Sequence, residues 1–157
     1  DRPGQERLFL LSTTHGAEMA GMGAFLATIK MMERENVVGH IWDYGRKLVA
    51  LMQEKAEAHG VANSLKIGGF PCSPYYLTLD DQGVPSLSLR TLFAQEMVRQ
   101  GVLMPWIALS WRHGEEELNL TGQALDIALP IYKKALADEP ERYLEGPVIK
   151  PVFRKFN

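Results

Sequence analysis

Residues 8–18 read LFLLSTTHGAE, a short apolar run that leads through Ser12, Thr13 and Thr14 and a glycine into a long helical pattern. The first turn of a helix leaves several backbone N–H groups unpaired and directs the positive end of the helix dipole at the same place. Hydroxyl groups at such a position favour a bound phosphate or carboxylate. The sequence therefore predicts an anion-binding turn at Thr13 and Thr14, and the alternative is that these hydroxyls cap their own helix.

The elements on either side of this turn are typical of a larger α/β domain. Residues 7–12 are predicted to form a strand, and the four residues between Arg7 and Ser12 are all apolar, as in a strand that is covered on both faces. Residues 16–35 follow as a helix rich in alanine and glycine, which permits close packing against a neighbour. The rest of the chain offers no parallel companions for that strand, so we expect the strand to belong to a sheet formed elsewhere.

The remaining pattern predicts an α+β arrangement with a small, antiparallel sheet. Turn residues and changes of hydrophobic period delimit its expected elements. The expected helices are 37–58, 89–100 and 119–137, and the expected strands are 65–70, 75–79, 102–104 and 107–110. Pro130 should kink or break the last helix because proline lacks a backbone N–H. After Asp138, three prolines and mixed charge predict an extended tail.

Composition places the chain among ordinary globular proteins and excludes several partners. The 157 residues are 46% hydrophobic and 23% charged, with a net charge of −2. Without concentrated Lys and Arg, we expect neither a nucleic-acid nor a membrane partner. Cys72 is the single cysteine, which excludes an internal disulfide and suits a cytoplasmic location. The chain starts at Asp1 without a methionine, close to a predicted strand, and we expect it to be a fragment of a longer polypeptide.

Three separated stretches resemble class III pyridoxal-phosphate aminotransferases, in particular the glutamate-1-semialdehyde 2,1-aminomutase branch. Residues 12–18 resemble the Ser-Thr-x-x-Gly segment of that family. Residues 92–105 are similar to its helix, glycine and strand, and residues 113–118 are similar to its His-x-Glu-Glu segment. The three stretches occur in the family's order, which makes their combination more specific than any one motif.

The resemblance implies the C-terminal part of a fold-type-I enzyme. Residues 1–35 would be the end of the large domain and the connecting helix, 36–138 the small α+β domain, and 139–157 an extended tail. Thr13, assisted by Thr14, would reach the phosphate of pyridoxal 5'-phosphate held by the partner subunit of a homodimer. The enzyme would move an amino group between or within small molecules. The Schiff-base lysine would lie outside this chain, so the chain alone should be inactive.

Two departures from the family pattern narrow this expectation. Gly16-Ala17-Glu18 stands where the family commonly has Gly-Asn-Pro. Trp106 stands where many members carry an arginine that holds a substrate carboxylate. Arg112 is nearby in the sequence but does not align with that position. The missing arginine resembles the aminomutase branch and argues against an ordinary α-amino-acid transaminase.

Other side chains have simpler interpretations. His15 is expected either to contact an anion or to cap a helix or lie at an interface. His113 is expected to cap a helix or reach a second subunit, and His40 and His59 are expected to face solvent. Residues 115–117 are expected to form the solvated first turn of a helix rather than a metal site. The three tryptophans are expected to anchor the core, although Trp106 could line a substrate opening. A rival function is a stand-alone α+β module that binds a ligand or partner without a cofactor.

Overall fold

The computed structural model describes residues 18–150 and divides the chain into two units. Among the described residues, one unit ends at Val37 and the other comprises residues 38–150. In the first unit, helix α1 spans Met19–Arg34, and Asn36 follows it with a φ of 47°. None of the side chains of α1 is buried, and Met19, Phe25 and Leu26 are among its exposed apolar residues.

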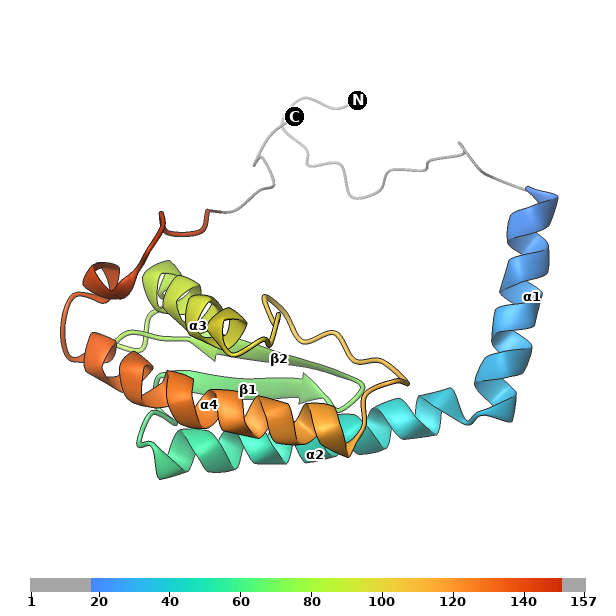
Figure 1. Cartoon of the computed structure of the whole chain (residues 1–157), viewed down its shortest axis with the longest axis horizontal. Helices are drawn as coiled ribbons and strands as arrows, with labels where there is room; N and C mark the ends of the chain where they lie inside the picture. Colours follow the sequence, from blue (N-terminus) through green and yellow to red (C-terminus); the bar gives the residue numbers. More distant parts are fainter. Residues whose placement is uncertain (1–17, 151–157) are drawn as a thin grey trace, which may run out of the picture. The chain divides into compact units, whose positions relative to one another are not determined.

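The second unit contains the small sheet that the sequence predicts, with helices around it (Figure 1). The sheet is a hairpin of β1 and β2. In chain order the elements are α2 (Val37–Ala58), β1 (Leu65–Phe70), β2 (Ser73–Thr78), α3 (Leu87–Arg99), α4 (Glu115–Leu136) and the 3₁₀ helix η1 (Pro140–Tyr143). Residues 38–150 therefore form an α+β unit.

The hairpin is antiparallel, with Leu65 opposite Thr78 and Phe70 opposite Ser73. Burial alternates along β2, where Tyr76 and Thr78 face the core and Tyr75 and Leu77 face outward. This alternation is the period-2 pattern of a strand that is covered on one face.

The core lies between the inner face of the hairpin and the helices. Many of its fully buried side chains come from α2, α3 and α4, and Leu65 of β1 joins them: Met52, Leu65, Leu92, Phe93, Met97, Leu125, Leu129 and Tyr132. The hydroxyl of Tyr132 donates to the carbonyl of Ser64 at 3.0 Å, which ties α4 to the residue before β1. Burial raises the pKa of this phenol above its ordinary value of 10.0.

The turn of the hairpin packs directly against α2 at Gly45. A Cβ atom added to Gly45 would collide with the carbonyl oxygen of Pro71 and would lie 2.9 Å from Cδ1 of Leu109. Glycine is therefore needed here so that the two backbones can approach closely, although it lowers the intrinsic stability of the helix.

Helices α2 and α4 are joined by packing and by polar contacts. A Cβ atom added to Gly122 of α4 would lie 3.5 Å from the side chain of Leu51 on α2, which is ordinary van der Waals contact. Asp126 accepts from Lys55 at 2.6 Å and lies 3.0 Å from Nε2 of His59. The expectation that His59 simply faces solvent was wrong, because its side chain is about three-quarters buried against this carboxylate.

The strands expected at 102–104 and 107–110 do not form within the described residues, and residues 101–113 are a loop. Pro105, between the two runs, has no N–H to donate to a sheet. The carbonyls of Met104 and Pro105 instead lie 2.9 and 3.1 Å from the hydroxyl of Tyr76, and Arg90 donates to Pro105 at 2.8 Å. Side chains therefore occupy the acceptors that a neighbouring strand would use.

Helix α4 begins at Glu115, earlier than expected, and continues through Pro130 to Leu136. Of the two predicted effects of Pro130, a kink or a break, the break was wrong. Leu129 and Tyr132 beside it are fully buried, and their packing keeps the helix in place despite the lost backbone hydrogen bond.

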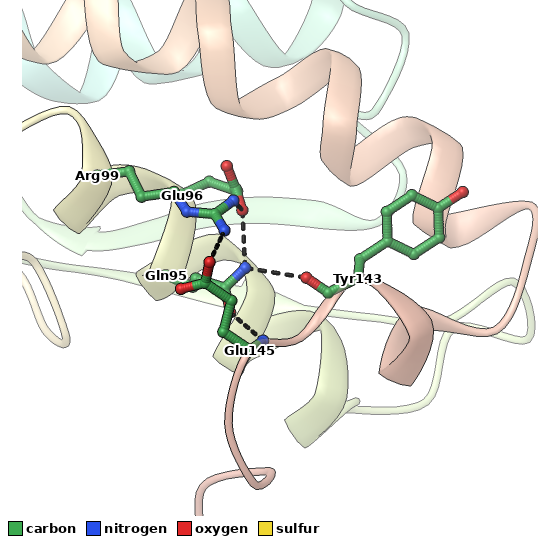
Figure 2. A network of polar contacts seen from close by, with 5 residues as sticks. All are labelled: Gln95, Glu96, Arg99, Tyr143 and Glu145. Carbon is green, nitrogen blue, oxygen red and sulfur yellow. Dashed lines mark hydrogen bonds and ion pairs between the residues drawn. The ribbon is translucent and has the colours of Figure 1, made fainter.

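The part of the tail that is described is partly helical rather than extended throughout, and polar contacts hold it to α3 (Figure 2). Gln95 donates to the carbonyl of Tyr143 at 2.9 Å and accepts from the N–H of Glu145 at 2.8 Å. Arg99 bridges the carboxylates of Glu96 and Glu145 at 2.5 Å each. We call residues 139–149 the strap.

Candidate functional site

Thr13, Thr14 and His15 lie outside the described residues, so the anion-binding turn stays a prediction. The helix expected to follow them is present as α1 from Met19 onward. Glu18 is its N-cap and makes no side-chain cap hydrogen bond.

Within residues 38–150, a pocket of about 220 Å³ lies between α2, the loop 101–113 and the start of α4. Its lining comes from these three segments: Tyr44, Leu48, Gly101, Val102, Leu103, Met104, Trp106, Ile107, Ala108, Leu109, His113, Glu117, Leu120 and Thr121. Most of these side chains are apolar, and a few polar groups gather at one wall, as is common in small-molecule sites.

The loop that forms one side of the pocket is held from the sheet. Tyr76 of β2 contacts the carbonyls of Met104 and Pro105, and the guanidinium of Arg90 lies 4.8 Å from the centroid of the Tyr76 ring. Burial raises the pKa of Tyr76, while nearby Arg90 opposes that rise. The sheet therefore fixes the position of the pocket's rim.

His113 contributes an oriented imidazole to the pocket wall. The backbone N–H of Ser110 donates to its Nδ1 at 3.3 Å, so in the neutral ring Nε2 carries the proton. His40 bonds through Nε2 to the carbonyl of His113 at 2.8 Å. The expectation that His40 faces solvent was wrong, because it is half-buried and braces this loop.

Tyr44 of α2 stands between the two histidines. Its ring centroid lies 6.3 Å from that of His40 and 5.5 Å from that of His113. Burial raises the pKa of Tyr44, and the negative charges of Glu117 and Glu115 raise it further. The phenol therefore stays protonated over the ordinary pH range.

Glu117 carries the negative charge of the pocket. Its Oε2 accepts from the N–H of Gly114 at 2.7 Å, which caps the start of α4. This hydrogen bond, one from its own backbone N–H, and the charge of nearby His113 lower the pKa of the carboxyl. Thr121 donates to the carbonyl of Glu117 at 2.7 Å and holds the same turn.

Sequence reasoning assigned no pocket role to Tyr44 or Glu117. One signal could have predicted the position of Glu117 at the start of α4. Glu117 follows Gly114 by three residues, and a glutamate three positions after an N-cap residue is typical of a helix start. Tyr44 carried no such signal, because its role depends on a loop more than fifty residues away.

The tryptophans do not anchor the core as expected. Trp106 is 69% exposed at the pocket rim, and Trp42 and Trp111 are only partly buried. The guanidinium of Arg112 stacks over Trp111 at 5.1 Å from the ring centroid and does not line the pocket. Trp111 is therefore stabilised in part by a cation contact rather than by enclosure in the core.

The lining of this pocket contains no lysine and no arginine. A phosphate-bearing aldehyde cofactor needs an amine for its aldehyde and cationic or N–H donors for its phosphate. The pocket instead offers an ionised carboxylate, so its residues do not fit that cofactor, and we assign the pocket no step of cofactor chemistry.

Among residues 18–150, no group of three His, Cys, Asp or Glu side chains is arranged to hold a metal ion. None of the helices in this part of the chain has the length and apolar character needed to cross a membrane.

Comparison with known proteins gives one informative match. No family model matches the chain, and no solved structure matches it. Over 129 residues, 80% of the chain, it is 30% identical to the 3-aminobutyryl-CoA aminotransferase of Cloacimonas acidaminovorans (strain Evry). The chain is similar to an aminotransferase. It spans 31% of the length of that relative.

This similarity supports the aminotransferase assignment drawn from the three sequence motifs. The relative is named for amino transfer, and nothing in its name points to the aminomutase branch. Because the chain spans less than a third of that protein, the match describes a part of such an enzyme.

Proposed function

We propose that this chain is the C-terminal part of a pyridoxal-phosphate-dependent class III aminotransferase of fold type I that acts as a homodimer. The observation that carries the proposal is the 30% identity over 129 residues to an aminotransferase. The order of the three motifs at residues 12–18, 92–105 and 113–118 adds support.

In this proposal Thr13 and Thr14 donate to the cofactor phosphate of the partner subunit. A hydroxyl and the backbone N–H groups at the start of a helix are suitable donors for a dianion. The cofactor, when bound, supplies the electron sink for moving the amino group. Residues 38–150 would cover the substrate cleft and exclude water from it.

We further propose transfer between two molecules rather than a shift within one. The named activity of the similar protein favours transfer. The aminomutase interpretation rested on the absence of an arginine at the position of Trp106. That absence has a second explanation. An amino compound whose carboxyl group is esterified, as in a 3-aminoacyl thioester, needs no arginine to hold a carboxylate.

The test measures cofactor retention in the full-length protein that contains this chain. Replacing Thr13 with valine removes one charge-assisted hydrogen bond and should weaken retention about tenfold. Thr28→Val is the matched control, because the hydroxyl of Thr28 bonds to the carbonyl of Ala24 within α1. The measurement is visible absorbance of the cofactor after dialysis.

The outcome separates the aminotransferase from the rival function. A stand-alone module without a cofactor predicts no bound cofactor in any variant. Equal retention by the Thr13→Val and Thr28→Val proteins would remove Thr13 from the cofactor site while leaving the family assignment open to product analysis with a panel of amino donors.

A further inference from the structure

We propose that the pocket between α2, the loop 101–113 and α4 binds a primary ammonium group carried on an apolar body, with Glu117 as the counter-charge. This proposal concerns binding by the chain itself and does not depend on the proposed amino transfer. It rests on the charge, the lining and the size of the pocket.

The permanent charge of the pocket is negative. Among the lining side chains, Glu117 is an acid held ionised by two backbone N–H groups, and His113 is the one base, which carries charge only when its imidazole is protonated. Two basic side chains outside the lining have other partners: Lys47 pairs with Glu115, and Arg112 stacks on Trp111. When His113 is neutral, an anion entering the pocket would meet Glu117 without a cation in the lining to offset it.

Glu117 keeps the capacity to accept from a ligand. An ionised carboxylate offers about four lone-pair sites, and the N–H of Gly114 and that of Glu117 itself use two of them. An ammonium group has three N–H donors and no acceptor, which complements a carboxylate that has spare acceptor sites. The exposed ring of Trp106 at the rim adds a favourable site for a cation.

The opposite part of the pocket suits an apolar body. Leu48, Met104, Ile107 and Leu109 line it, and Met104 and Ile107 are themselves buried. A space of about 220 Å³ admits a six-carbon chain or one aromatic ring and is too small for a nucleotide.

The experiment titrates the 157-residue chain with n-hexylammonium chloride and follows its amide signals by NMR. Sodium hexanoate and hexanol are matched probes with the same apolar chain and a negative or neutral head. We expect saturable shifts at Gly101, Ala108 and Thr121 with hexylammonium, weaker ones with hexanol and none with hexanoate. Equal or tighter binding of hexanoate, or no saturable shift with hexylammonium, would overturn the proposal.

Glu117→Gln tests the counter-charge directly, because glutamine retains an amide oxygen that can accept from Gly114 and so preserves the helix cap. We expect about tenfold weaker hexylammonium binding with hexanol binding unchanged. Glu116→Gln is the matched control, since Glu116 is the adjacent exposed residue and does not line the pocket. Equal losses in the two variants would indicate a general surface charge effect and would contradict the proposal.

A second variant keeps the test decisive if Glu117→Gln alters the fold. Trp106 is 69% exposed, so Trp106→Leu leaves the core intact. It removes the aromatic face while retaining an apolar side chain. We expect hexylammonium binding to weaken severalfold more than hexanol binding. An equal change for both probes would remove Trp106 from the ammonium site and would contradict the proposed cation contact.

Discussion

Replacing Tyr132 with phenylalanine should destabilise the protein near neutral pH and stabilise it in strong alkali. At about pH 8 the variant loses the hydrogen bond from the Tyr132 hydroxyl to the carbonyl of Ser64, which costs about 1 kcal/mol. The cost stays near this value because the carbonyl of Ser64 also accepts from the N–H of Leu79 at 2.7 Å and is not left unpaired.

The sign reverses in alkali because burial raises the folded-state pKa of Tyr132 above 10.0. Above pH 10 the unfolded chain releases this proton and the folded chain keeps it, so the wild-type protein loses about 1.4 kcal/mol of stability per pH unit from this group. Phenylalanine has no such proton. The free energies of unfolding of the wild-type and Tyr132→Phe proteins should therefore become equal at about pH 11. There, the stability that the wild-type protein loses by keeping this proton matches the contribution of the hydrogen bond that the variant lacks.

The assay is urea unfolding followed by the circular dichroism of the helices, from about pH 8 to pH 11. Tyr143→Phe is the control, because the Tyr143 hydroxyl is partly exposed and lies 3.5 Å from Asp138. The Tyr143→Phe protein shows what removing a phenol outside the buried core does over the same pH range. A constant difference between the wild-type and Tyr132→Phe proteins across the range would refute the linkage between burial of Tyr132 and stability.

Two further predictions concern packing and the strap. Gly45→Ala should destabilise the fold by about 1–3 kcal/mol, because the new Cβ atom collides with the carbonyl of Pro71; thermal unfolding measures this loss, and an unchanged melting temperature would show that the contact is not close. Arg99→Met should release the strap by removing the bridge between buried Glu96 and Glu145, which hydrogen exchange would report as faster exchange at the Glu145 amide. Unaltered exchange at that amide would mean that Gln95 holds the strap alone.

The sequence was most informative where local signals and packing agree. Helix α2 has the predicted bounds, and the hairpin forms where alternation and turn residues place it. The loop 101–113 was predicted wrongly because short apolar runs look alike in strands and in pocket linings. The conformation of this loop depends on Tyr76, whose hydroxyl contacts the loop from a strand that lies earlier in the sequence.

The candidate pocket was only partly foreseeable. Trp106 was expected to line an opening or to anchor the core, and its place at the pocket rim agrees with the first of these. The joint placement of Tyr44, His113 and Glu117 depends on how α2 meets the start of α4, which no local pattern encodes. The predicted roles of Thr13 and Thr14 remain predictions. The division of the chain into domains after residues 35 and 138 also remains a prediction.

The way in which β2 holds the pocket loop has a consequence for variation. Tyr76 and Arg90 bind backbone carbonyls of Met104 and Pro105, and every residue type has a carbonyl to offer. Leu103 and Trp106 on either side are 81% and 69% exposed and take no part in this attachment. Substitutions at these two positions therefore alter the side chains that the pocket presents to a ligand without moving the backbone of the loop. Mutation of this loop is thus a way to change which ligands the pocket selects.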